Sequence, residues 1–332
     1  MRIAVIGAGS WGTTLGDLLA RAGHETLLWA REPEVVDSIT RDQVNTLFLP
    51  GARLDKGLRA TGAIASAVNG AELLVFATPS HATRAVATEV GKAVRTPAPL
   101  AVSVSKGLEP DSLELLTDVL EEALPGSAVA ALSGPSFAQE VYQRDPTAVV
   151  AASRDPKAAE MVQQAFATGY FRVYRSHDVV GVQLGGALKN VIAIAAGILE
   201  GMGLGHNSRA GLITRGLAEI ARLGAALGAD PLTFAGLAGM GDLVLTATGA
   251  LSRNRTLGVE LGQGRSLAEI LSERRTVAEG VTTAKSAVEL GRRAGVELPI
   301  AAEVSRILFE DKPPKQAIRD LMERELKAEQ WR

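Results

Sequence analysis

The stretch RIAVIGAGSWG, residues 2–12, decides the fold. Its apolar run at 3–6 predicts a short buried strand, and residues 13–22 have the spacing of apolar side chains that is typical of a helix. Between them, glycines at 7, 9 and 12 form the pattern GxGxxG. This pattern, after a first strand and at the start of a helix, is typical of a dinucleotide-binding site, although an ordinary glycine turn between strand and helix is the alternative.

Each glycine of the pattern has a separate expected role. Gly7 allows the tight turn, Gly9 lets a pyrophosphate approach the backbone, and Gly12 lets the helix pack closely on the strand. The free N–H groups at the start of the helix favour the negative charge of the phosphates. We therefore expect cofactor phosphates over this loop.

The first half of the chain continues to alternate between strand and helix patterns, which predicts a parallel sheet with helices on both faces. The further strand candidates are 25–29, 73–77, 100–105, 129–132, 148–152 and 171–174. After about residue 177 only helical patterns follow, at 179–199, 207–227, 230–237, 252–261, 266–271, 281–294, 299–310 and 314–324. We predict two domains, a dinucleotide-binding domain at 1–180 and a helical substrate-binding domain at 181–332.

Composition restricts the class of protein. The 332 residues are 46% hydrophobic, and 35 Lys and Arg against 37 Asp and Glu give a net charge of −2. Such a near-neutral chain has no overall field for binding nucleic acid. The absence of cysteine suits the cytoplasm, and the apolar run 191–199 is too short to cross a bilayer. We expect a cytoplasmic protein without membrane insertion or a nucleic-acid partner.

The end of the second strand candidate bears on the choice of cofactor. Sites that prefer NAD usually have an acidic residue there for the ribose hydroxyls, whereas this chain has Arg31 followed by Glu32. A guanidinium group matches the geometry of a 2′-phosphate. We expect NADPH as the preferred cofactor and NADH as a second one, with a solvated surface arginine as the alternative.

Polar residues follow two of the strand candidates, where ligands of such sheets bind. Lys106 follows the strand at 100–105, and Gly134, Pro135 and Ser136 follow the strand at 129–132. Lys106 is placed to meet an anion or a carbonyl group, Pro135 suits the first position of a helix, and Ser136 could donate to a ligand. A surface lysine and a helix-start turn are the alternatives.

Lys189 and Asn190 are polar residues in a helix that is otherwise apolar nearly all round, which predicts burial. Burial lowers the pKa of a lysine and makes it able to donate or accept a proton near neutral pH. The alternative is a lysine that extends from the helix end to solvent.

A third polar group comes late in the chain, with Asp242 and the run Ser252-Arg253-Asn254-Arg255. Asp242 and Ser252 could cap helices. The two arginines would then lie in a first helical turn, where the helix dipole disfavours cations, and this suggests a bound anion. Salt bridges to carboxylates are the alternative. The four histidines have no metal-ligand spacing, so we predict no metal.

Together the motifs resemble those of the bacterial NAD(P)-dependent glycerol-3-phosphate dehydrogenases. The resemblance extends in order along nearly the whole chain. The similar stretches are GAGSWGT (7–13), LPG (49–51), PSH (79–81), SKG (105–107), GPSFA (134–138), LKNVIAIAAGI (188–198), GLGHNSRA (203–210), GMGDLVLT (239–246), SRNR (252–255) and VAEGVTTA (277–284). Two positions depart from the family pattern: Ala247 stands where the family commonly has Cys, and Arg31 occupies a variable position.

The resemblance implies a Rossmann-type α/β domain followed by an all-α domain similar to the C-terminal domain of 6-phosphogluconate dehydrogenase. It implies interconversion of dihydroxyacetone phosphate and sn-glycerol 3-phosphate, which supplies glycerophospholipid synthesis, in an enzyme that is often a homodimer. By motif position, Lys189 is similar to the family's proton acceptor. The positions that resemble substrate contacts are Lys106, Gly134, Ser136, Asp242, Ser252, Arg253 and Asn254. Those that resemble cofactor contacts are Ser10, Trp11, Arg31, Phe48, Lys106, Ala138, Arg253, Val277 and Glu279.

Two other functions stay open at this point. A dehydrogenase on the same plan could act on a β-hydroxy acid or a sugar acid, and a nucleotide sensor could have kept the cofactor fold without turnover. The SRNR run and the two lysines favour a phosphorylated substrate and a catalytic site. From the chemistry of the residues, we expect Lys106 and Asn190 to polarise the C2 oxygen of the substrate and Asp242 to hold the Lys189 ammonium group.

Overall fold

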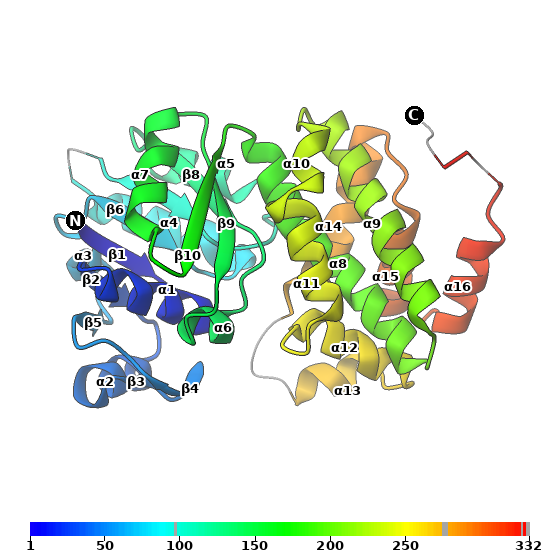
Figure 1. Ribbon diagram of the computed structural model, residues 1–332, viewed down its shortest axis with the longest axis horizontal. Helices are drawn as coiled ribbons and strands as arrows, with labels where there is room; N and C mark the ends of the chain where they lie inside the picture. The colour runs from blue at the N-terminus through cyan, green and yellow to red at the C-terminus, as the bar shows by residue number, and fades with distance from the viewer. Residues whose placement is uncertain (96–97, 274–277, 327, 330–332) are drawn as a thin grey trace.

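The computed structural model describes residues 1–95, 98–273, 278–326 and 328–329. Figure 1 shows a sheet flanked by helices in the N-terminal part and helices alone in the C-terminal part, side by side. The last strand ends at Ser176 and the helix α8 begins at Val179. The predicted boundary at residue 180 thus falls at the start of α8, and the division into 1–180 and 181–332 stays a prediction.

Within the described residues, the main sheet has eight strands in the order β10-β9-β8-β7-β6-β1-β2-β5. Their bounds are β1 (Arg2–Ile6), β2 (Glu25–Trp29), β5 (Leu58–Thr61), β6 (Leu73–Phe76), β7 (Leu100–Ser103), β8 (Val129–Ser133), β9 (Thr147–Ala152) and β10 (Phe171–Ser176). The strand β5 and a small hairpin, β3 (Val44–Asn45) with β4 (Leu49–Arg53), were not predicted.

The expectation of a wholly parallel sheet is wrong at one edge. β9 pairs antiparallel with β8, and β10 pairs parallel with β9, so both of these strands run opposite to the rest. A buried apolar run has the same composition in either direction, so the sequence pattern does not show this reversal.

Helices cover both faces of the sheet, as predicted. Alternate residues of β1 show the division: Ile3 and Val5 pack with α1 and α7, whereas Ala4 and Ile6 pack with α3, α4 and α5. The bounds are α1 (Ser10–Arg21), α2 (Pro33–Asp42), α3 (Ile64–Val68), α4 (Ser80–Ala93), α5 (Leu116–Ala123), α6 (Ala138–Tyr142) and α7 (Pro156–Phe166). α6 begins at Ala138, so the expectation that Pro135 opens a helix is wrong.

The C-terminal part is helical, as expected, and its helix bounds agree with the predicted ones to within about two residues except in one region. The helices are α8 (Val179–Gly201), α9 (His206–Ala226), α10 (Pro231–Ala235), α11 (Asp242–Thr248), α12 (Arg253–Gly262), α13 (Leu267–Ser272), α14 (Glu279–Ala294), α15 (Pro299–Phe309) and α16 (Pro314–Met322). Between α10 and α11 the segment Leu237–Gly241 forms a π-helical turn. The predicted helix 230–237 therefore ends early, and α11 was missed, because the close glycines at 236, 239 and 241 obscure helical spacing.

The central element is α8. It is long and apolar enough to cross a membrane, but 94% of its most apolar window is buried inside the protein, as in a core helix. α12 crosses it at very short distance: a Cβ added to Gly197 would lie 2.0 Å from the carbonyl oxygen of Arg255, and one added to Gly258 would lie 2.1 Å from that of Ile194. This contact fixes α12 and the residues at its start against the helix that carries Lys189.

Candidate active site

The glycine loop between β1 and α1 has the geometry that the sequence predicts. Gly7 has a φ of +113°, which favours glycine. A Cβ added to Gly12 would lie 1.9 Å from the carbonyl oxygen of Gly7, so the helix start and the turn are in backbone contact. A Cβ added to Gly9 would meet no atom within 4 Å, so space is open over the first N–H groups of α1.

Two residues that were predicted to contact the cofactor, Trp11 and Phe48, lie next to this loop. Trp11 is partly buried, and its Nε1 donor is buried without a hydrogen-bond partner in the described part of the chain. The backbone N–H of Phe48 donates to Oδ1 of Asn45 over 3.0 Å. Asn45 in turn donates to the carbonyl oxygen of Ala8 (2.9 Å) and to Oγ1 of Thr13 (2.8 Å), which ties the Phe48 segment to the glycine loop. Sequence reasoning missed Asn45, since a lone asparagine carries no motif.

Alanine substitutions at two of the glycines separate packing from binding. Gly12→Ala is expected to lower the free energy of unfolding by about 1–3 kcal/mol, because the new Cβ overlaps backbone that cannot rotate away. Gly9→Ala is expected to leave stability unchanged and to weaken NADPH binding at least tenfold, because the methyl group fills the open space. Chemical denaturation and fluorescence titration with NADPH check both results, and equal effects of the two variants on stability would contradict the assignment.

Lys106 follows β7 in the chain, and its ammonium group contacts three other residues that the sequence predicted for the site. Its Nζ donates to the carbonyl oxygen of Gly134 (2.7 Å), to Oγ of Ser136 (3.3 Å) and to Oδ2 of Asp242 (2.8 Å). Gly134 and Ser136 follow β8, and Asp242 opens α11 of the helical part. The ammonium group of Lys106 thus joins the carboxyl ends of two strands to the second domain.

Lys189 meets the same carboxylate from the other side. Its Nζ donates to Oδ1 of Asp242 and to Oγ1 of Thr246 (2.7 Å), and the Lys189 side chain is 6% exposed. Asp242 is completely buried, and Gly241, not Asp242, occupies the N-cap of α11. The capping alternative for Asp242 and the solvent-exposed alternative for Lys189 are therefore wrong. Thr246 is a second contact that the sequence did not single out.

Burial and charge set the protonation of Lys189. The pKa of its ammonium group is lowered to about 7. Desolvation is the main cause; the carboxylate of Asp242 opposes it and the neighbouring Lys106 ammonium adds to it. A lysine with this pKa exists in both protonation states near neutral pH. It can therefore donate or accept a proton in the same cluster that would hold a substrate.

A chain of amides connects this cluster to the two later helices. Nδ2 of Asn190 donates to the carbonyl oxygen of Lys106 (3.1 Å), and Oδ1 of Asn190 accepts from Nδ2 of Asn254 (2.9 Å). Oδ1 of Asn254 accepts from the backbone N–H of Gly280 over 3.0 Å. Both amides thus have protein partners, and the expected contact of Asn190 with the substrate oxygen stays a prediction.

At the start of α12, Ser252 caps the helix as expected, accepting from the backbone N–H of Arg255 over 3.2 Å. Arg255 forms a two-point ion pair with Glu200 of α8, at 2.9 Å and 2.5 Å. The salt-bridge alternative is therefore correct for Arg255. Arg253 and Asn254 lie at the first two positions of α12, beside Asn190 of the cluster.

The helix α4, which begins at Ser80 of the PSH motif, contacts Glu279, a predicted cofactor residue. Glu279 accepts from the backbone N–H of Ser80 (3.1 Å) and from its Oγ (2.5 Å), at the start of α4. Ala138 opens α6 next to α1, and its carbonyl oxygen accepts from Oγ1 of Thr14 over 3.2 Å. Val277 lies outside the described residues.

Arg31 lies apart from the lysine cluster, beyond the end of β2. Its guanidinium is 81% exposed and pairs with the carboxylate of Glu32 at 2.8 Å. Ser10 is the first residue of α1, the helix that follows β1, and β1 pairs with β2. The arginine is thus accessible to a 2′-phosphate, which would compete with Glu32 for it.

Two sequence profiles match this chain. One, described as the N-terminus of NAD-dependent glycerol-3-phosphate dehydrogenase, matches residues 2–159, and one described as its C-terminus matches residues 178–319. Together they cover most of both parts of the fold.

Relatives and solved structures agree with the profiles. The chain is 56% identical over 333 residues to a glycerol-3-phosphate dehydrogenase [NAD(P)+] of Geobacter sulfurreducens, covering 99% of each protein, and 52% identical to one of Myxococcus xanthus with the same coverage. It superimposes on a crystal structure of the Coxiella burnetii glycerol-3-phosphate dehydrogenase with a TM-score of 0.93 at 38% identity, over 97% of this chain and 98% of that one. The glycine loop, the lysine–aspartate cluster and these similarities over the full length establish that the chain belongs to the NAD-dependent glycerol-3-phosphate dehydrogenase family.

Proposed function

We propose that this protein interconverts dihydroxyacetone phosphate and sn-glycerol 3-phosphate, using NADPH or NADH. The observation that carries the proposal is the buried carboxylate of Asp242 between the ammonium groups of Lys106 and Lys189. Two cations against one carboxylate favour an anionic substrate with an oxygen that gains negative charge during reaction.

The residues at the glycine loop fit a dinucleotide, with open space at Gly9 and the unpartnered indole donor of Trp11. When bound, the nicotinamide supplies hydride to C2 of the ketone or takes it from the alcohol. We assign the pyrophosphate to the N–H groups at the start of α1. We assign further cofactor contacts to Ser10, Trp11, Arg31, Phe48, Lys106, Ala138, Arg253, Val277 and Glu279.

Lys189 is the proposed proton donor and acceptor. In reduction its ammonium group gives a proton to the C2 oxygen, and in oxidation its neutral amine takes the hydroxyl proton. Thr246 and Asp242 hold its Nζ in one place, so the proton is delivered at a fixed position. The Lys106 ammonium stabilises negative charge on the same oxygen.

The start of α12 is the proposed phosphate site. Arg253 supplies a guanidinium, Ser252 and Asn254 flank it, and free N–H groups of the first helical turn add to its affinity for an anion. The amide chain from Lys106 through Asn190 and Asn254 sets this site at a fixed separation from the lysines.

A substrate comparison tests the proposal. Oxidation of NADPH is followed by absorbance with dihydroxyacetone phosphate, with unphosphorylated dihydroxyacetone, and with a β-keto acid. We expect rapid oxidation with the phosphorylated ketone alone. Preference for the keto acid would support the hydroxy-acid dehydrogenase alternative, and tight NADPH binding without any oxidation would support a sensor.

The preference between cofactors rests on Arg31 and Glu32. Arg31→Ala is expected to raise the KM for NADPH about tenfold and to leave that for NADH unchanged, because the lost ion pair with the 2′-phosphate exists in one cofactor only. Glu32→Gln is expected to lower the KM for NADPH, because Arg31 loses its competing carboxylate. Steady-state kinetics with both cofactors check this, and equal changes for the two would contradict the role of Arg31.

We further propose that the enzyme works in the cytoplasm and that its product supplies glycerophospholipid synthesis. The lack of cysteine and the burial of α8 support a cytoplasmic location. A homodimer, which the family resemblance implies, stays a prediction that light scattering can test.

A further inference from the structure

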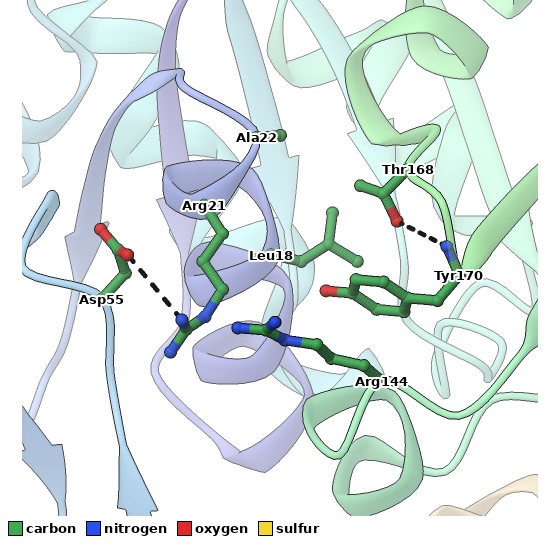
Figure 2. Close-up of a pocket in the computed structure, with 7 residues that line it drawn as sticks. All are labelled: Leu18, Arg21, Ala22, Asp55, Arg144, Thr168 and Tyr170. Carbon is green, nitrogen blue, oxygen red and sulfur yellow. Dashed lines mark hydrogen bonds and ion pairs between the residues drawn. The ribbon is translucent and has the colours of Figure 1, made fainter.

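A pocket lies at the carboxyl end of α1 (Figure 2), and neither lysine of the cluster nor Asp242 lines it. Its volume is about 320 Å³, at the lower end of the range for small-molecule sites. Leu18 and Ala22 of α1 form an apolar wall, and none of the predicted site residues lines it. The pocket is therefore independent of the proposed active site.

Three elements direct polar side chains into this pocket. Figure 2 shows Arg21 of α1, Arg144 from the turn after α6, and Tyr170 from the loop before β10 pointing toward one another. Arg144 has a φ of +66°, which non-glycine residues rarely adopt. The chain thus places a guanidinium at this point at some conformational cost.

The charge of Arg21 is already balanced. Its Nε donates to the buried carboxylate of Asp17 over 2.7 Å, and Nη1 lies 3.9 Å from Oδ2 of Asp55. Asp55 itself accepts from the backbone N–H of Gly57 over 2.8 Å. Both carboxylates therefore already accept hydrogen bonds, Asp17 from Arg21 and Asp55 from the backbone of its own loop.

The guanidinium group of Arg144, an exposed residue, has no hydrogen-bond or ion-pair partner among the described residues. The hydroxyl group of Tyr170 likewise has no hydrogen-bond partner in the described chain, and burial raises its pKa, which keeps it a donor. Oγ1 of Thr168 accepts from the backbone N–H groups of Tyr170 (3.4 Å) and Phe171 (3.0 Å), which leaves its hydroxyl hydrogen for another acceptor.

Three donors that line the pocket thus have no acceptor among the described residues: the Arg144 guanidinium and the hydroxyl groups of Tyr170 and Thr168. The carboxylate of Asp55, which also lines the pocket, lies against Arg21. We propose that this pocket is a binding site for a small organic anion. Its carboxylate or phosphate oxygens accept from Arg144, Tyr170 and Thr168, and its carbon skeleton packs on Leu18.

Calorimetric titration of the full chain with two probes, succinate and inorganic phosphate, tests the site and separates the two sources of the anion. Each is titrated into wild type, Arg144→Gln and Tyr170→Phe. Arg154→Gln is the matched control, since it removes one positive charge from a residue that pairs with Glu121 and Asp118 outside the pocket. Because phosphate also fits the proposed active site, the series is repeated with Arg253→Gln as the parent.

We expect a binding event, for at least one probe, that persists in Arg253→Gln. Arg144→Gln weakens it at least tenfold and Tyr170→Phe about threefold, the losses expected for a charged and a neutral donor, and Arg154→Gln leaves it unchanged. The probe that binds more tightly identifies the anionic group. Binding that is equal in wild type and Arg144→Gln, or absent for both probes once Arg253 is replaced, would overturn the proposal. Circular dichroism verifies that each variant is folded. If Arg144→Gln does not fold, Tyr170→Phe still tests the site, because it removes only one hydroxyl group.

Discussion

Lys189→Met is expected to lower kcat for dihydroxyacetone phosphate reduction by about two to four orders of magnitude, the range that general acid–base catalysis contributes. Methionine keeps the length of the side chain and its fit among apolar neighbours, so the protein remains folded. It has no proton to give to the C2 oxygen. NADPH affinity is expected to stay within about threefold of wild type, because the glycine loop lies in the other part of the fold.

The matched control is Lys157→Met, which removes a lysine from the exposed start of α7 and is expected to leave kcat unchanged. Stopped-flow measurement of NADPH oxidation with the two variants compares them directly. A Lys189→Met enzyme with near-native turnover would show that another group carries the proton.

Asp242→Asn is expected to act on both stability and rate. The fully buried carboxylate bridges two ammonium groups, and its loss leaves them facing each other without a counterion. Removing one partner of a buried ion pair costs about 3–5 kcal/mol, so the midpoint of denaturation falls sharply at neutral pH. The rate falls at least a hundredfold, because neither lysine keeps its position and the pKa of Lys189 drops further once the stabilising charge is gone.

Asp118→Asn provides the control, since Asp118 forms a surface ion pair with Arg154 at 3.2 Å. Such pairs contribute at most about 1 kcal/mol, so its denaturation curve should nearly coincide with that of wild type. Urea denaturation of both variants at one pH makes the comparison. Equal stability of Asp242→Asn and wild type would mean that the two lysines do not depend on this carboxylate.

The sequence predicts the parts of this fold whose physical cause is local. Turn geometry and close packing make Gly7 and Gly12 recognisable from a short motif, and the apolar surroundings of Lys189 predict its burial. Strand direction at β9 has no such local cause, since it depends on which neighbour the strand pairs with. The π-helical turn before Asp242 likewise depends on tertiary contact: a Cβ on Gly239 would lie 2.2 Å from the carbonyl oxygen of Phe234.

The same distinction applies to the site. Lys106 and Lys189 were singled out from their surroundings, and the contact of Asp242 with the Lys189 ammonium group was expected. The contact of Lys106 with the same carboxylate was not expected, because it joins residues 136 positions apart. Asn45, Ser80 and Thr246 were missed as contacts, because a short polar side chain has no sequence signature for a partner far along the chain. The substrate contacts expected of Asn190 and Asn254 stay predictions, and in the structure their amides pair with each other and with three backbone groups.

The central claim is that one lysine, with its pKa lowered to about 7, carries the proton in both directions of the reaction. Below this pH Lys189 is an ammonium group that can donate, and above it a neutral amine that can accept. The direct test is kcat/KM against pH, measured for dihydroxyacetone phosphate reduction and for sn-glycerol 3-phosphate oxidation with the same enzyme preparation, because this ratio reports groups of the free enzyme. The account predicts that reduction falls and oxidation rises as the pH increases through about 7. Profiles that change in the same sense, or that stay flat through neutral pH in both directions, would contradict it.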